Sequence, residues 1–307
     1  MRLRGPRARG YPHDHMPRLR EVLSRIGLAA KSRDVLVTGL PRSGTTLTCH
    51  LLQKLPDTVA LDEPIDIRTF APDRSRDEMC DDVARFLRRQ RRSIAQRGVA
   101  VSKHAGGKVP DNPVGTARND AGKRTNEGID KGEIAIDKAL APGFLLVVKH
   151  NASFTGLLDA LVARFDVFAV MRNPLAVLGS WNSVSLEVGR GHVPAAERVD
   201  PQLAADLAGI DDVLGRQLHI LDWFYARYRD LLPAERVIRY EDVVATGGKC
   251  LAVINPLAAS LDEPLASRNR SELYDGEGVK AIGRRLLATD GAYWHFYTRR
   301  SVEDLVR

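Results

Sequence analysis

The sequence contains few cysteines and no long apolar run. Its 307 residues include three cysteines, Cys49, Cys80 and Cys250, which are widely spaced and form no CxxC pair. This spacing argues against a disulfide framework and against a zinc site. No stretch approaches the roughly 20 apolar residues that cross a bilayer, and the basic N-terminus is not followed by the apolar core of a secretory signal. These absences predict a soluble, cytoplasmic protein without a membrane span.

The excess of positive charge is small. Lys and Arg number 46 and Asp and Glu number 39, so the formal net charge is +7. Such a charge suits an anionic ligand but is too modest to indicate nucleic-acid binding. Arginine-rich runs at 2–9 and 86–97 are typical of solvated faces. His13 and His15 form a near pair without further ligands, so we expect neither a nucleic-acid partner nor a bound metal.

Apolar runs alternate with helical patterns along the chain. The runs predicted as strands are 34–39, 58–63, 143–149, 167–172 and 236–243. The segments predicted as helices include 45–54, 76–97, 153–164, the stretch that begins at Asn173 and one long amphipathic helix from Leu203 to Tyr228. Apolar strands alternating with helices favour a parallel sheet that is covered on both sides. The sequence therefore predicts an α/β fold, a three-layer P-loop-type sandwich with a central parallel sheet of about five strands and helices on both faces.

The chain is predicted to be a single domain over residues 1–307. Residues 1–30 are expected to form an N-terminal extension with a short helix at 17–30. Residues 98–143 contain many Gly, Lys, Asp and Asn residues and few large apolar ones. Such a composition predicts an insertion that is either disordered or a mobile lid.

Chemistry-bearing residues follow the predicted strands. In a parallel sheet, ligands bind at the carboxyl ends of the strands. The residues expected along this rim are the loop after Gly39, Asp62 with Glu63, Lys149, Arg172 and Tyr240. The sequence therefore predicts one cleft at this edge of the sheet.

Residues 39–46 read GLPRSGTT and lie between a predicted strand and a predicted helix. Gly39 and Gly44 allow the backbone to curl so that amide groups and the positive end of the helix face an anion. In ATP and GTP enzymes a lysine follows the second glycine, and here that position is Thr45. The positive charge is supplied by Arg42. The other expected anion contacts are Ser43, Gly44, Thr45 and Thr46.

The stretch PRSGTT, residues 41–46, resembles the 5'-phosphosulfate loop of sulfotransferases that use 3'-phosphoadenosine 5'-phosphosulfate, PAPS. A second stretch, VMRNPLAVLGSW, resembles the 3'-phosphate site of that family, with Arg172 and Ser180 at the matching positions. An arginine can hold a phosphate through two hydrogen bonds, and a hydroxyl adds a neutral donor. The resemblance implies transfer of a sulfonate from PAPS by in-line displacement, with PAP as product and no metal.

Two weaker matches extend the resemblance. VIRYEDV resembles the strand whose tyrosine contacts the adenine side of the cofactor, which makes Tyr240 the matching residue; a core aromatic is the alternative. LLVVKHN resembles the strand that carries a lysine near the transferred sulfonate, which makes Lys149 the candidate; a solvated strand-end lysine is the alternative.

Two residues compete as the base that removes the proton of the acceptor. The position of Glu63 resembles that of the glutamate base in sulfotransferases of the tyrosylprotein, Golgi and related type, and Asp62 could take its place. His150 resembles the histidine base of the cytosolic branch, which there lies two residues after the lysine. Here it directly follows Lys149, and adjacent residues of a strand point to opposite faces. We therefore prefer Glu63, with Lys149 and Arg42 as the other catalytic residues.

The sequence thus predicts a PAPS-dependent sulfotransferase that acts on a small-molecule or glycan acceptor. One alternative is a P-loop kinase or NTPase with an altered loop, in which Asp62 would bind the metal. Another is a noncatalytic nucleotide-binding protein. The sequence has no motif that identifies the acceptor or the oligomeric state.

Overall fold

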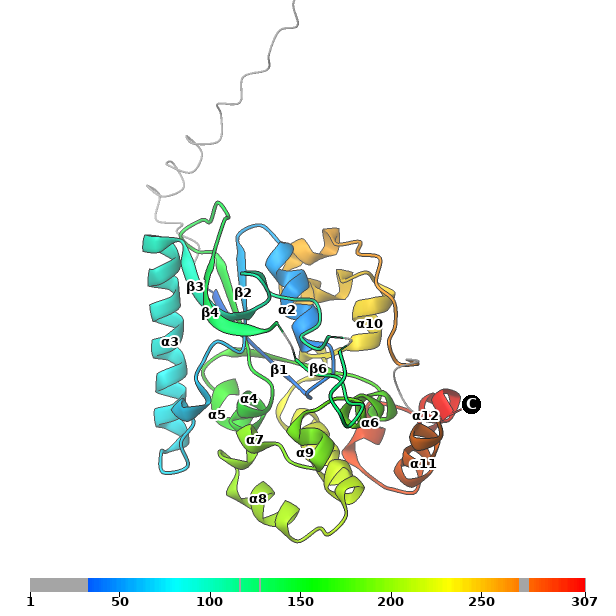
Figure 1. The fold of residues 1–307 in the computed structure, drawn as a ribbon. Helices are drawn as coiled ribbons and strands as arrows, with labels where there is room; N and C mark the ends of the chain where they lie inside the picture. The colour runs from blue at the N-terminus through cyan, green and yellow to red at the C-terminus, as the bar shows by residue number, and fades with distance from the viewer. Residues whose placement is uncertain (1–32, 116, 127, 271–275, 307) are drawn as a thin grey trace, which may run out of the picture.

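Five parallel strands form the central sheet of the computed structural model, which describes residues 33–306 except 116, 127 and 271–275 (Figure 1). Their order across the sheet is β2-β5-β1-β6-β7. The strands are β1 (Arg33–Gly39), β2 (Thr58–Asp62), β5 (Leu145–Lys149), β6 (Asp166–Met171) and β7 (Val237–Arg239). The predicted parallel sheet of about five strands is confirmed. The expected extension at 1–30, with its helix, lies outside the described residues.

The strands at the centre of the sheet are buried on both faces. Every residue of β2 and of β5 is buried, as are the last five residues of β1. Only strands covered on both faces can consist almost entirely of apolar residues, which is why they read as apolar runs in the sequence. The predicted α/β fold with helices on both faces is confirmed.

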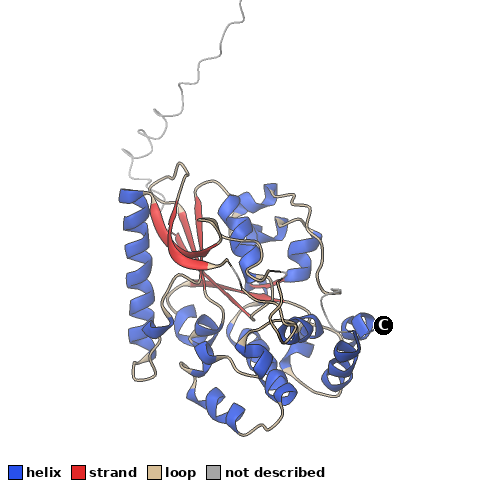
Figure 2. Ribbon diagram, in the orientation of Figure 1, coloured by secondary structure: helices blue, strands red, loops and turns tan. Residues whose placement is uncertain are grey.

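Helices surround the sheet on both sides (Figure 2). Those before β6 are α2 (Thr45–Lys54), α3 (Arg76–Arg97), α4 (Ala152–Gly156) and α5 (Leu158–Val162). Those after it are α6 (Pro174–Asn182), α7 (Pro194–Glu197), α8 (Pro201–Ala208), α9 (Val213–Leu231), α10 (Tyr240–Ala245), α11 (Gly276–Leu287) and α12 (Arg299–Val306). The predicted bounds of α2 and α3 match. Helix α3 begins where predicted because Ser75 and Glu78 form a reciprocal capping box.

Three predicted elements are wrong in part. The helix expected over 153–164 is two short helices, α4 and α5. The long helix expected from Leu203 is two helices, because the chain leaves the helix after α8 and the Asp212 side chain then caps α9 by accepting the Gly215 amide. The strand expected over 236–243 ends at Arg239, and Tyr240 begins helix α10. The stretch 236–243 is too short for its apolar pattern to distinguish a strand from a turn of helix.

The segment 98–143 contains two strands, β3 (Val99–His104) and β4 (Asp130–Ala135), which pair antiparallel as a second sheet. Disorder is therefore the wrong expectation for these two strands. The alternation of buried Ala100 and Ser102 with more exposed neighbours anchors β3, and buried Ile134 anchors β4. A mobile lid role for this segment stays a prediction.

Candidate active site

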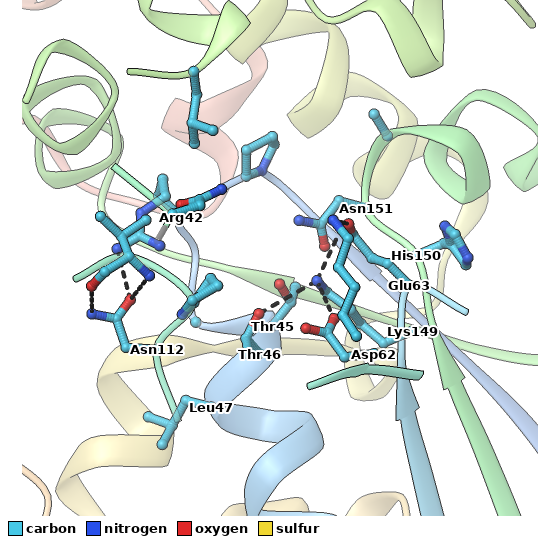
Figure 3. A pocket seen from close by; sticks show the side chains of 18 of the residues that line it. Arg42, Thr45, Thr46, Leu47, Asp62, Glu63, Asn112, Lys149, His150 and Asn151 are labelled. Atoms are coloured by element: carbon cyan, nitrogen blue, oxygen red, sulfur yellow. Dashed lines mark hydrogen bonds and ion pairs between the residues drawn. The ribbon is translucent and has the colours of Figure 1, made fainter. Parts of the chain in front are cut away.

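A cavity of ≈ 930 Å³ lies at the carboxyl ends of the central strands (Figure 3). Its volume is in the range of sites that hold small molecules. The predicted site residues that line it are Arg42, Gly44, Thr45, Thr46, Asp62, Glu63, Lys149, His150, Arg172 and Tyr240. The structure thus brings together residues that are up to two hundred positions apart in the chain.

The loop between β1 and α2 is held in shape by two left-handed residues, Arg42 at φ 71° and Gly44 at φ 94°. A Cβ on Gly44 would lie 2.6 Å from Cδ2 of Tyr240, so only glycine fits against this ring. Ser43 is buried, and its hydroxyl donates to the carbonyl of Val170 at 2.7 Å. The Ser43 hydroxyl therefore fixes the loop to β6, while Thr45 and Thr46 line the cavity.

Arg42 connects three parts of the chain. Its Nε donates to Oγ of Ser180 at 3.3 Å, and its Nη2 donates to Oδ1 of Asn112 at 3.1 Å. Ser180 is buried in the last turn of α6, and Asn112 belongs to the segment between β3 and β4. The arginine of the loop and the serine of the second predicted phosphate site are therefore neighbours.

Arg172 and Tyr240 are stacked. The guanidinium carbon of Arg172 lies 4.6 Å from the centre of the Tyr240 ring, a cation–π contact. Arg172 also donates through Nη1 to the carbonyl of Arg42 at 3.1 Å and through Nε to Oδ1 of Asn269 at 2.8 Å. The Tyr240 hydroxyl accepts the Arg268 amide at 3.0 Å. Sequence reasoning missed Arg268 and Asn269, because they lie outside any helix or strand and match no motif.

Lys149 lies between two carboxylates and the loop (Figure 3). Its Nζ is 2.7 Å from Oδ1 of Asp62, 3.1 Å from Oε1 of Glu63 and 3.4 Å from Oγ1 of Thr46. Asp62 and Lys149 are paired in the parallel ladder of β2 and β5. Their side chains are only 2% and 3% exposed. The alternative of a solvated strand-end lysine does not describe this environment.

Glu63 reaches the same lysine because its backbone is left-handed, with φ 42°. This conformation interrupts the alternation of a strand, so the adjacent Asp62 and Glu63 side chains both contact Lys149. The second oxygen of Glu63, Oε2, is 2.5 Å from Nζ of Lys103 on β3. Sequence reasoning missed Lys103 because the segment that carries it was expected to be disordered or mobile.

The charges of this cluster are set by burial and by each other. Burial raises the pKa of the Glu63 carboxyl, but the ammonium groups of Lys149 and Lys103 outweigh it and hold that pKa below its usual range. Burial raises the pKa of Asp62 against the opposing effect of Lys149. Burial lowers the pKa of Lys149, but the two carboxylates outweigh it and raise that pKa above its usual value. Glu63 and Lys149 are therefore charged at neutral pH.

His150 points away from the ammonium group of Lys149 (Figure 3). Its Nε2 accepts the Ile65 amide at 2.9 Å, and its ring packs against Phe70 and Phe154. Burial lowers the pKa of His150 to about 3. The His150 ring is therefore neutral, and its Nε2 is already engaged by the Ile65 amide; the choice of Glu63 as the base stays a prediction.

Within the described part of the chain, no group of three His, Cys, Asp or Glu residues is placed to hold a metal ion. No helix of that part is long and apolar enough to cross a membrane. Asp62, the residue proposed above as a metal ligand of a kinase, is instead paired with Lys149.

The solved structures that are similar to this chain include two sulfotransferases. The sulfotransferase domain from the Synechococcus PCC 7002 olefin synthase is 14% identical, with a TM-score of 0.36, and the match covers 90% of this chain and 94% of that domain. Sulfotransferase STF1 from Mycobacterium tuberculosis H37Rv is 15% identical, with a TM-score of 0.36, over 88% of this chain and 82% of that one. No protein-family model and no curated protein matches the chain. The assignment of an activity therefore depends on the site residues themselves.

Proposed function

We propose that this protein is a sulfotransferase that moves the sulfonate group of PAPS to a hydroxyl or amine of a small-molecule or glycan acceptor. The observation that carries the proposal is the position of Lys149, whose Nζ lies 3.4 Å from the Thr46 hydroxyl. The loop lacks its own lysine, and β5 supplies one from the neighbouring strand. The carboxylates of Asp62 and Glu63 contact this lysine, so the negative charge of the site is paired with the Lys149 ammonium group.

The residues of the cavity fit the two anionic ends of PAPS. Loop amides and Arg42 would hold the 5'-phosphosulfate, and Arg172 would hold the 3'-phosphate. Ser180, the expected second contact of the 3'-phosphate, is buried outside the cavity lining and accepts from Arg42 Nε. Tyr240 would lie on the adenine side. The contact of Arg172 with the Arg42 carbonyl, 3.1 Å, makes the two anion sites neighbours, as one nucleotide requires. PAPS would supply the activated sulfonate, bonded to a phosphate that leaves readily.

The residues of the chain then have separate tasks. The Glu63 carboxylate accepts the proton of the acceptor hydroxyl as the oxygen attacks sulfur in line. The new oxygen–sulfur bond forms as the bond between sulfur and the phosphate oxygen breaks, and PAP leaves with that electron pair. Lys149 and Arg42 stabilise the negative charge that builds on the sulfonate and the leaving oxygen. This assignment requires Glu63 to loosen its contacts with Lys149 and Lys103 during the reaction.

Binding of PAP tests the nucleotide site. We expect calorimetry to show PAP binding that is much tighter than ATP–magnesium binding. Arg172→Ala should weaken PAP at least about ten-fold, because a charge-assisted contact to phosphate is lost. Arg198→Ala is the matched control, since Arg198 is exposed and is not one of the residues that line the cavity. A preference for ATP–magnesium would favour the kinase alternative and overturn the proposal.

Substitution of the base tests the chemistry. Acceptors are first identified by incubating cell extracts with labelled PAPS and following the mass gain. We expect Glu63→Gln to reduce kcat on such an acceptor by about 10²–10⁴-fold, with PAP affinity kept. Unchanged turnover in Glu63→Gln would refute the base assignment. PAP binding without transfer to any acceptor would support the noncatalytic alternative.

A further inference from the structure

We propose that Lys103 and Lys131 form a recognition site for an anionic group on the acceptor, close to the hydroxyl that receives the sulfonate. The inference rests on the proposed function, because it names the acceptor class of the same cavity. Neither lysine is needed for the contacts assigned to PAPS. Both line the cavity, and both come from the β3–β4 sheet of the inserted segment.

The two lysines lie directly opposite each other. Lys103 and Lys131 are partners in the antiparallel ladder of β3 and β4. Like charges at opposed positions destabilise a strand pair, so this arrangement weakens the small sheet when no anion is bound. The Nζ of Lys131 donates to the carbonyl of Ile65 at 2.7 Å, and no ion pair recorded for the described residues includes it. Burial lowers the pKa of Lys131, and the carboxylates of Asp66 and Glu63 oppose this effect without outweighing it.

The β3–β4 sheet is fixed next to the candidate base, Glu63. The Ser102 hydroxyl accepts the Asp62 amide at 2.9 Å, which ties β3 to the end of β2. This contact places Lys103 Nζ 2.5 Å from one oxygen of Glu63, while the other oxygen is 3.1 Å from Lys149. The Glu63 carboxylate therefore lies between Lys149, the lysine assigned to the transfer step, and Lys103 of the segment 98–143.

This geometry limits the acceptor. A hydroxyl that contacts Glu63 lies within a few bonds of any group that contacts Lys103. An anionic group on the acceptor would also draw Lys103 away from Glu63, which removes one of the two cations that lower the pKa of this carboxyl. The correct acceptor would thus make Glu63 a stronger base. The same cavity is also lined by Ile67, Ile129, Leu186 and Val193, which suit a hydrocarbon body. The acceptor class is a hydroxy acid with a short spacing between hydroxyl and acid.

The test compares acids with their neutral amides. Lactate, mandelate and salicylate, each with its amide, are titrated by calorimetry into the full-length protein with and without saturating PAP. We expect at least one acid to bind about ten-fold tighter than its amide, since an ionic contact is gained. Lys131→Met and Lys103→Met should each reduce this preference to about two-fold or less, while Lys131→Arg keeps it. Lys108→Met is the matched control, because Lys108 is an exposed lysine of the same segment outside the cavity lining.

Each outcome has one meaning. Three results would overturn the lysine site: every acid binds as its amide does, no acid binds at all, or the preference for the acid survives in both Met variants. Thermal unfolding of the variants checks that they fold. If PAP binds but no acid is preferred, only this inference fails. If PAP does not bind but the acids do so through Lys131, the proposed function fails and the anion site remains.

Discussion

A buried ammonium group is stable only beside negative partners, and Lys149 has two within reach. Removing one member of such a cluster leaves the others without compensation. Asp62 would be destabilised most by loss of Lys149, because its side chain is only 2% exposed and Lys149 is its ion-pair partner. The stability of the fold and the chemistry of the site therefore depend on the same side chains.

We expect Lys149→Met to lower the free energy of unfolding by about 3 kcal/mol near neutral pH. Without the lysine, burial keeps the folded-state pKa of Asp62 above its unfolded value. A raised folded pKa favours folding at low pH, and this contribution is lost as the pH rises through the folded pKa. The destabilisation should therefore be smaller near about pH 5 than near about pH 8, as urea unfolding at both pH values can measure.

The double variant Asp62→Asn with Lys149→Met is the control for this prediction. It should recover most of the lost stability, and its remaining loss should no longer grow with pH, because the buried carboxyl is gone. A loss in Lys149→Met that is the same at both pH values would contradict the assigned role of Asp62.

Single residues differ in how far the sequence identifies them. Lys149 and Glu63 could be predicted because each ends an apolar run, and parallel strands bring such ends together. The ion pair of Lys149 with Asp62 could not, because it depends on which strands are neighbours and in which register. The role of Glu63 also depends on its left-handed backbone, for which a glutamate gives no signal in the sequence.

At the scale of elements, the segment 98–143 is attached to the residues that directly follow helix α6. Arg124 is buried, its Nη2 donates to the Ser183 hydroxyl at 2.8 Å, and its amide donates to the Ser183 carbonyl at 3.1 Å. The Ser185 amide in turn donates to the Arg124 carbonyl at 2.8 Å. With the Arg42–Asn112 contact, these bonds hold the segment beside both predicted phosphate sites.

We expect Arg124→Ala to loosen this attachment. The amides of Arg124 and Ser185 should exchange with deuterium at least about ten-fold faster, while the amides of the central sheet keep their rates. Mass spectrometry of the exchanged protein measures both. Arg118→Ala is the matched control, since Arg118 lies in the same segment but is exposed. Equal exchange in the two variants would show that the Arg124 side chain does not hold the segment.

Helices and strands of strong pattern could be predicted from the sequence, and attachments between them could not. The β3–β4 sheet was missed because it is largely exposed, with two buried positions in β3 and one in β4. Helix α10 was read as a strand because VIRYEDV is too short to show a period. Long-range contacts such as that of Arg124 with Ser183 produce no local pattern in the sequence.

At the scale of the whole molecule, the cations of the cavity come from separate strand ends. Arg42 follows β1, Lys149 ends β5 and Arg172 follows β6. Their fields add in one partly enclosed space, although the net charge of the chain is only +7. An anionic ligand of this cavity would therefore be attracted by the assembled fold and not by any single segment.

We expect PAP affinity to fall steadily as the salt concentration is raised from about 0.05 M to about 0.5 M, because exposed charge interactions are screened. Calorimetry at several salt concentrations gives the slope. Arg172→Ala should reduce the slope, whereas Arg198→Ala should leave it unchanged. A salt-independent affinity would contradict an anion site made of these cations.

The pairing of Asp62 with Lys149 has a consequence for assembly of the sheet. The two residues are opposite each other in the ladder of β2 and β5, where all other side chains of β5 are apolar. The valine and leucine side chains would tolerate a shifted alignment of the two strands. A shift would, however, separate the Lys149 ammonium group from the Asp62 carboxylate and leave both buried without a partner. The charges of the candidate site would therefore also select the one correct alignment of the two strands, so an error in this alignment would disrupt the fold and the site together.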